Sequence, residues 1–157
     1  MGLRINAIVI NAFLAPALEH LRILTGSDTA LERMEICSEL PSTAFTMRID
    51  VHGSLEGAVY WSFDSALAER LAIYMLPPGS RTQDTGLKLD AVAELANIIV
   101  GNATGNLLES GYDVQFLPPR HQAGTRLANG HPNLVLLTPV GRVRIVFELQ
   151  IALPRAS

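Results

Sequence analysis

The chain has 157 residues, of which 48% are apolar and 17% charged, and its formal net charge is −3. The length fits one domain over residues 1–157, and the balance is that of a globular protein. No run of Lys and Arg marks a surface for a phosphate backbone, so nucleic-acid binding is not expected. The mean hydropathy is +0.26, but the longest uncharged stretches, 5–18 and 95–108, are shorter than the roughly 20 residues that span a bilayer. We therefore expect a cytoplasmic protein without a membrane segment.

The cysteine and histidine content argues against two common kinds of site. The single cysteine, Cys37, has no partner for an internal disulfide and fits a reducing compartment. We interpret it as a small residue within a strand rather than a catalytic thiol. The histidines, His20, His52, His121 and His131, lie in different predicted elements without the spacing of metal ligands.

The first half of the chain reads as one helix and three strands. Apolar periodicity predicts a helix at 5–25 that ends at Gly26 and contains Pro16, which is expected to bend it. Alternating apolar and polar residues then predict three strands of an antiparallel sheet with one covered face, at 33–40, 46–51 and 58–63. Gly53 and Gly57 are assigned to the turn before the third strand.

The second half repeats this order after a short helix at 65–76, which Pro77-Pro78-Gly79 closes. A long helix is expected at about 87–110, ended by Gly111. Three further strands are expected at 112–117, 133–138 and 142–153, with 118–132 as a long loop. The predicted fold class is therefore α+β, with two pseudo-duplicated halves of one helix and three strands and with the long helices packed on an antiparallel sheet.

The long helix separates into two faces when its residues are placed 100° apart around its axis. The residues on one side are apolar and predict the core face: Val92, Ala96, Ile99, Ala103 and Leu107. The residues opposite them are polar or lack a side chain: Asp90, Glu94, Asn97, Gly101 and Gly105.

The glycines and bordering apolar residues distinguish this stripe from an ordinary solvated surface. Each glycine costs about 1 kcal/mol relative to alanine inside a helix, but it allows another chain to approach closely. Ile98 and Leu108 border the stripe, where a solvated helix would carry Lys or Glu. The pattern favours a docking surface, although the wheel alone leaves a plain solvated face open, because E-x-x-N arises often by chance.

Residues 90–103, DAVAELANIIVGNA, resemble the signature of the CheC/CheX/FliY family of chemotaxis phosphatases. That signature has Asp or Ser, then Glu after three residues, Asn after two more, and a proline some twenty residues later. Pro119 stands at close to the usual spacing, with Pro118 as the other candidate. Glu and Asn have this spacing once in the chain, which is similar to the one-site CheX members, and weaker similarity extends over nearly the full length.

The resemblance implies a hydrolase that removes the phosphoryl group from the aspartate of a CheY-like receiver domain in two-component signalling. Asn97 would position the attacking water, and Glu94 would pair with a lysine of the receiver. The remaining motif and stripe residues would contact the partner: Asp90, Ile98, Gly101 and Gly105. A carboxylate in the first helical turn explains Asp90 equally well. The chain would need no cofactor of its own, because the receiver holds the Mg²⁺, and it would form a homodimer through a sheet edge.

Two other functions compete with this one. A non-catalytic adaptor that docks on a receiver or a flagellar switch component would share the fold and the docking surface. A small-ligand sensor could use the predicted 118–132 loop as a lid, an idea that rests on loop length alone.

Overall fold

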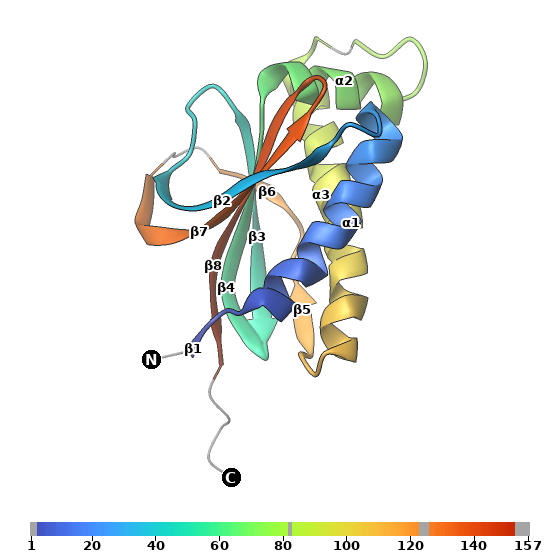
Figure 1. Ribbon diagram of the computed structural model, residues 1–157. Helices are drawn as coiled ribbons and strands as arrows, with labels where there is room; N and C mark the ends of the chain where they lie inside the picture. The colour runs from blue at the N-terminus through green and yellow to red at the C-terminus, as the bar shows by residue number, and fades with distance from the viewer. Residues whose placement is uncertain (1–2, 82, 123–125, 153–157) are drawn as a thin grey trace.

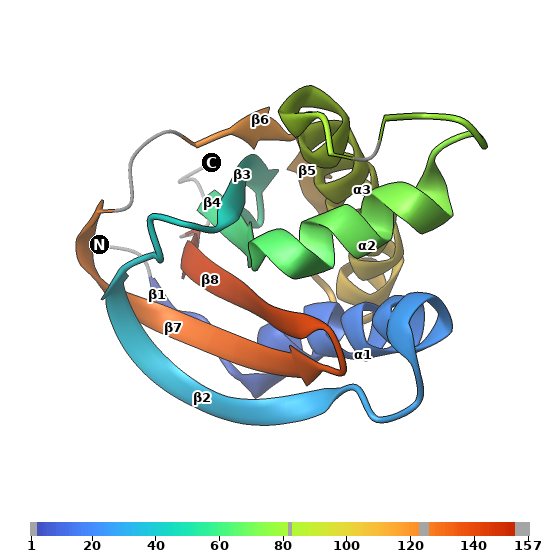
Figure 2. The same cartoon turned by 90° about the horizontal axis from the view of Figure 1, so that it is seen from above.

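The computed structural model describes residues 3–81, 83–122 and 126–152, and it shows one antiparallel sheet with helices on one face (Figures 1 and 2). The helices are α1 (Ala7–Thr25), α2 (Ser65–Met75) and α3 (Thr85–Glu109). The strands are β1 (Leu3–Arg4), β2 (Ala30–Glu39), β3 (Phe45–Gly53), β4 (Leu55–Phe63), β5 (Val114–Phe116), β6 (Arg120–His121), β7 (Arg126–Thr138) and β8 (Gly141–Ile151). The α+β class with helices on an antiparallel sheet is thus confirmed.

The order of the strands shows the predicted duplication. The main path of the sheet is β2-β7-β8-β4-β3-β5. In the duplication β2 corresponds to β5, β3 to β7 and β4 to β8. When each strand is replaced by its counterpart, the same path is obtained in reverse order. Helix α1 precedes the first set of strands and α3 the second. Each half therefore donates its first strand to the sheet edge formed by the other half, so neither half can complete its own sheet.

The two central strands supply the middle of the core. Strand β4 pairs with β8 over its whole length, from Leu55 opposite Ile151 to Phe63 opposite Val143. The helix-facing side chains of both strands alternate as predicted, and Trp61, Phe63 and Phe147 are almost completely buried beneath the helices. The other face of β4 is also buried in part, because Tyr60 packs with Leu40 in a second, smaller cluster.

Strand β2 corrects the expectation of a covered apolar face in the first half. Its exposed side chains include Met34, 60% exposed, and Ile36, 70% exposed. The reason is position: β2 pairs with β7 at the end of the sheet, outside the area that α1 covers (Figure 2). Leu40 was assigned to the same face, but it follows a register shift after Cys37 and is buried in the smaller cluster.

Two other predictions about loops and turns were wrong, and one short strand was missed. Much of the predicted 118–132 loop is strand: β6 pairs with β3, and β7 begins at Arg126 rather than 133. Gly57 lies inside β4 rather than in a turn, and a Cβ atom there would overlap the Glu148 carbonyl oxygen of β8. Strand β1, which pairs with β8, was not expected. Residues 123–125 lie outside the described part of the chain.

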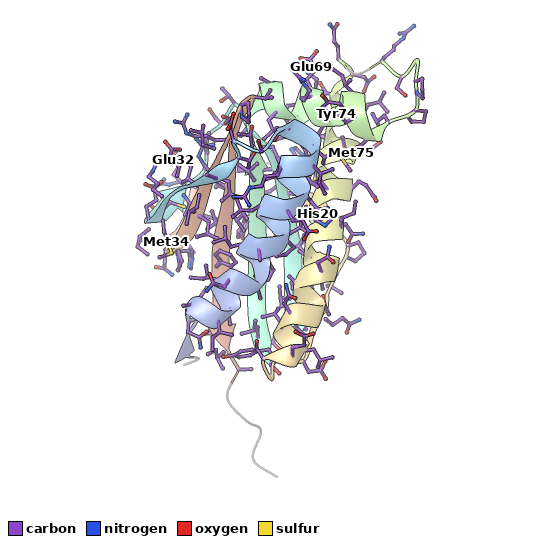
Figure 3. All side chains as sticks on the ribbon, turned by 45° about the vertical axis from the view of Figure 1, so that its right-hand side comes forward. His20, Glu32, Met34, Glu69, Tyr74 and Met75 are labelled. Atoms are coloured by element: carbon purple, nitrogen blue, oxygen red, sulfur yellow. The ribbon has the colours of Figure 1, made fainter. Side chains whose placement is uncertain are left out.

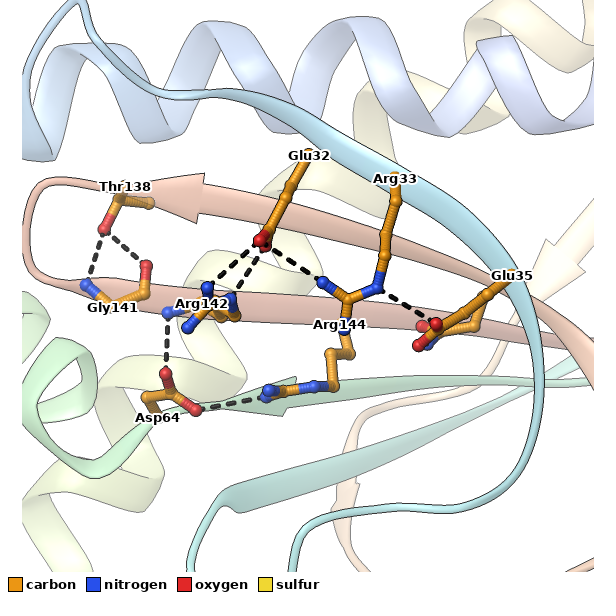
Figure 4. Close-up of polar contacts among 9 residues, drawn as sticks. Glu32, Arg33, Glu35, Asp64, Thr138, Gly141, Arg142 and Arg144 are labelled. Atoms are coloured by element: carbon orange, nitrogen blue, oxygen red, sulfur yellow. Dashed lines mark hydrogen bonds and ion pairs between the residues drawn. The ribbon is translucent and has the colours of Figure 1, made fainter.

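Polar contacts on the outer side of the sheet tie β2 and Asp64, the residue just before α2, to β8 (Figure 4). The Arg142 guanidinium donates two hydrogen bonds to Glu32, at 2.7 and 3.0 Å, and this bond is the main reason that the pKa of Glu32 lies below its usual value. Asp64 accepts from the Arg142 backbone at 2.8 Å and from Arg144 at 3.1 Å. Of these contacts, the Arg142–Glu32 pair joins β8 to β2, in addition to the pairing of β2 with β7.

Helix α1 packs against the sheet and α3. It is long and apolar enough to cross a membrane by length and composition, yet its Val9, Phe13 and Leu21 side chains are buried in the core. The Phe13 ring meets Phe147 edge to face, with 5.3 Å between ring centroids. Core helices of soluble proteins pass the same test of length and composition.

A side chain of α3 compensates for the proline inside α1. Pro16 has no backbone N–H, so the Ala12 carbonyl one turn earlier lacks its usual helical donor. The Asn106 side-chain amide of α3 donates to this carbonyl at 3.1 Å, and Ala12 is only 7% exposed. An unsatisfied buried carbonyl costs about 1–3 kcal/mol, so Asn106 both compensates for the proline and joins the helices.

We predict that Asn106→Ala lowers the free energy of unfolding by about 1–3 kcal/mol. The loss should be smaller when Pro16 is also replaced by Ala, because residue 16 can then donate to the Ala12 carbonyl itself. Urea unfolding followed by the fluorescence of the single, buried Trp61 measures both effects in a double-mutant cycle. Equal losses in the two backgrounds would contradict this account.

Candidate functional site

Both ends of α3 are fixed by local contacts. The Asp84 carboxylate accepts from the Leu87 N–H at 3.2 Å and so caps the first turn. At the other end Gly111 has a φ of 91°, and the Tyr112 N–H returns to the Leu107 carbonyl at 2.8 Å. The predicted stop at Gly111 is confirmed, and the helix begins two residues before the predicted start.

The structure places the predicted stripe on the open side of α3. Its residues are all exposed: Asp90, Glu94, Asn97, Gly101 and Gly105. The opposite side is buried in the core through residues that include Val92, Ile99 and Leu107. Ile98 borders the stripe and is half-buried, and Leu108 is 60% exposed.

The two glycines of the stripe are not required by contacts within the described chain. A Cβ atom at Gly101 or Gly105 would meet no heavy atom within 4 Å. Both residues therefore carry the helix-propensity cost of glycine without a packing reason inside the described structure. Glycine at these positions lets another chain approach the helix closely, as the predicted docking surface requires.

The polar pair of the stripe is available to a partner. Within the described residues, neither Glu94 nor Asn97 uses its side chain in a hydrogen bond or ion pair. From residue 89 to residue 109 the helix contains Asp90, Glu94 and Glu109 but no Lys or Arg. The stripe is therefore acidic, and it favours a partner that presents a positive charge.

Helix α1 supports α3 along one side of the stripe. The Asn102 amide nitrogen lies 2.9 Å from Nε2 of His20 and also donates to the Ile98 carbonyl at 3.2 Å. Since an amide nitrogen only donates, Nε2 of His20 is the acceptor in this arrangement. Asn102 and Asn106 thus link α3 to α1 from the border of the stripe, a role that the sequence pattern did not reveal.

The structure also places the motif residues outside the Glu94/Asn97 pair, which are Asp90, Pro118 and Pro119. Asp90 is in the second turn of α3, since the helix begins at Thr85 and has no acidic residue in its first turn. The alternative of a first-turn carboxylate is therefore wrong, and Asp90 is an exposed member of the stripe. Pro118 and Pro119 lie between β5 and β6, which pair with successive parts of β3. Because proline cannot donate to a strand ladder, they interrupt this edge.

One known protein family matches a segment of the chain that contains α3 and most of the sheet. Residues 45–136 match the family described as "Chemotaxis phosphatase CheX". This match covers well over half of the chain and includes all of α3. The chain belongs to the CheX family.

Relatives of the CheX family cover nearly the whole chain. The CheY-P phosphatase CheX of Thermotoga maritima is 26% identical over 137 residues, which are 86% of this chain and 88% of that protein. The crystal structure of chemotaxis protein CheX from Vibrio vulnificus has a TM-score of 0.74 at 21% identity and covers 93% of this chain and 100% of that one. A crystal structure of a CheX-CheY-BeF3-Mg²⁺ complex from Borrelia burgdorferi gives a TM-score of 0.64 at 20% identity, with 90% and 97% covered.

Cys37, the other reactive side chain considered, lies away from α3 on the edge strand β2. Burial raises the pKa of its thiol, and the nearby Glu35 carboxylate raises it further. A thiol with a raised pKa is mostly protonated at neutral pH and is a poor nucleophile. This agrees with its interpretation as a small strand residue.

We predict that Gly101→Ala raises the free energy of unfolding by about 0.5–1 kcal/mol, because the added methyl group meets open space and alanine favours the helix. Gly101→Leu should also fold, but its longer side chain should weaken the binding of a protein partner to the stripe. Urea unfolding and calorimetric titration with that partner measure the two effects. Unchanged binding by the Leu variant would mean that the docking surface lies elsewhere.

Proposed function

We propose that the protein dephosphorylates the aspartyl phosphate of a CheY-like receiver domain. The supporting observation is the position of Glu94 and Asn97, exposed and without internal partners on the open side of α3, in a chain of the CheX family. The relative from T. maritima is a CheY-P phosphatase, and the B. burgdorferi relative forms a complex with CheY, BeF3 and Mg²⁺.

The proposed chemistry needs positioning more than activation. An aspartyl phosphate is an activated acyl phosphate, and its hydrolysis requires a water in line with the phosphorus and the leaving carboxylate oxygen. The Asn97 carboxamide oxygen accepts a hydrogen bond from this water, and the amide nitrogen donates to a phosphoryl oxygen. A neutral amide performs this task without bringing another negative charge toward the phosphate.

Glu94 supplies the electrostatic contact that orients the partner. It lies three residues before Asn97, so the two side chains share one face with Cβ atoms about 5–6 Å apart. In the proposal its carboxylate pairs with the lysine beside the receiver's phosphoaspartate. The acidic stripe adds to this attraction, since Asp90 is the next exposed carboxylate along it.

The metal ion of the reaction is assigned to the partner. Receiver domains hold a divalent ion, here taken as Mg²⁺, at their phosphorylation site, where it neutralises phosphoryl oxygens. In this proposal the chain brings no cofactor of its own, only the amide and the carboxylate. The cytoplasm, where receiver domains act, is the proposed location.

We also propose a homodimer that forms along β2. This strand is one end of the sheet, and its side chains Leu31, Met34 and Ile36 are 40%, 60% and 70% exposed. Pairing of two β2 strands about a two-fold axis would continue one sheet through both copies and place these side chains beside those of the second copy. At the other end β5 and β6 are short and separated by the two prolines, which makes that edge a poorer template.

An adaptor without catalysis would use the same stripe, and the first experiment separates the two functions. We predict that the protein accelerates loss of phosphate from acetyl-phosphate-charged CheY-like receivers of its source genome. Asn97→Ala should reduce this acceleration by roughly a hundredfold or more while receiver binding persists. Asn11→Ala, which removes an exposed amide from α1, serves as the matched control. Binding without acceleration by the wild type would establish the adaptor instead.

The dimer is tested by placing charge on β2. Met34→Lys combined with Ile36→Lys should convert a dimer at micromolar concentration into a monomer, because like charges from two copies would meet at the shared edge. Light scattering coupled to size exclusion measures the mass. Ile73→Lys, a change at a 54% exposed position of α2, is the control and should stay dimeric. A wild-type monomer at high micromolar concentration would refute the dimer.

A further inference from the structure

The exposed apolar residues of the helices are not all explained by the Glu94/Asn97 site. Ile23 of α1 is 74% exposed, and Tyr74 of α2 is 54% exposed. Both lie in the last turns of helices that pack against α3. Tyr74 differs from Ile23 in having an ordered partner on the surface.

Arg70 holds the Tyr74 side chain in place. Its guanidinium donates to the Tyr74 hydroxyl at 3.3 Å and lies 5.8 Å from the centre of the ring. The two residues are four apart on α2, so they are neighbours on one helical face. A ring fixed in this way loses little conformational freedom when a partner covers it, and tyrosine is among the residues that most often dominate interface energies.

Tyr74 lies on the same side of the molecule as the contact between α1 and α3. Figure 3 looks onto the helices and shows Tyr74 and Met75 of α2 above His20 of α1, beside α3. His20 is the residue that contacts Asn102 of α3 at 2.9 Å. Met34 of β2 lies at the far left of that view, so a second copy bound along β2 would leave Tyr74 open.

The length of α3 between its start and Glu94 is short enough for one interface to include both α3 and α2. Helix α3 starts nine residues before Glu94, about 14 Å along its axis, and α2 packs directly on α3. A protein that buries roughly 800 Å² on each side covers a patch about 30 Å across. A receiver centred on Glu94 and Asn97 would therefore extend over the neighbouring end of α2.

We propose that Tyr74, oriented by Arg70, is a specificity-determining contact for the receiver domain. The residue acts outside the reacting atoms: it adds affinity for receivers that present an apolar or polarisable surface next to their phosphorylation site. This inference rests on the proposed phosphatase function, and it assigns selection of the partner to α2 and catalysis to α3.

The test compares Tyr74→Ala with Ile73→Ala in steady-state dephosphorylation and in calorimetric binding to a BeF3-activated CheY-like receiver from the source genome. Ile73 has the same exposed fraction, 54%, but points about 100° away around α2. Tyr74→Ala should raise KM and Kd about tenfold and leave kcat unchanged, as expected for a contact made equally before and during reaction. Ile73→Ala should match the wild type in all three.

A conservative variant separates the contribution of the Tyr74 ring from that of its hydroxyl. Tyr74→Phe keeps the ring but loses the hydroxyl that Arg70 binds, so it should raise KM less than Tyr74→Ala does. Circular dichroism establishes that every variant is folded. If Tyr74→Ala binds and reacts like the wild type while Asn97→Ala is inactive, the phosphatase stands and the role of Tyr74 is refuted. If the wild type binds no receiver, the proposed function fails and this inference fails with it.

Discussion

Burial of one face of α3 against the sheet determines which of its residues a partner can meet. Val92, Leu95 and Ile99 are almost completely buried, and each such side chain contributes about 1.5–3 kcal/mol when it leaves water. Turning the helix by one residue would expose several of them and bury charged groups at further cost. The orientation of Glu94 and Asn97 therefore follows from the apolar side of the same helix.

The contacts between α1 and α3 make that orientation firm without covering the stripe. Asn106 satisfies the Ala12 carbonyl that Pro16 leaves without a donor, and Asn102 contacts His20. Both amides lie between the buried and the open side of α3, so they join the helices at the border of the stripe. Gly101 and Gly105 beside them present no side chain, so in the proposed complex a partner can approach the helix backbone closely.

The duplicated architecture gives its two halves different tasks. The second half carries the Glu94/Asn97 pair on α3, and α1, its counterpart in the first half, has no such pair. Conversely β2 of the first half is a ten-residue edge strand, whereas its counterpart β5 has three residues. The proposed reaction and the proposed dimer thus use opposite halves of one pseudo-symmetric fold, and the two proposals do not compete for one surface.

The sequence alone determined the class of fold, the helices, most strands and the stripe of α3. These features depend on local periodicity, which does not change with the arrangement of the elements in space. Examples are the alternation of apolar and polar residues in β8 and the helical spacing of Glu94, Asn97 and Gly101. The sequence did not determine which strand lies at the edge of the sheet, so Met34 and Ile36 were wrongly given a covered face. It also missed that 126–132 continues β7, since this segment is strand through its pairing with β2 and not through its own pattern. Tertiary structure alone joined Asn106 to Ala12 and brought Tyr74 to the side of α3, because these contacts join residues that are distant in the chain and leave no periodic signal in it.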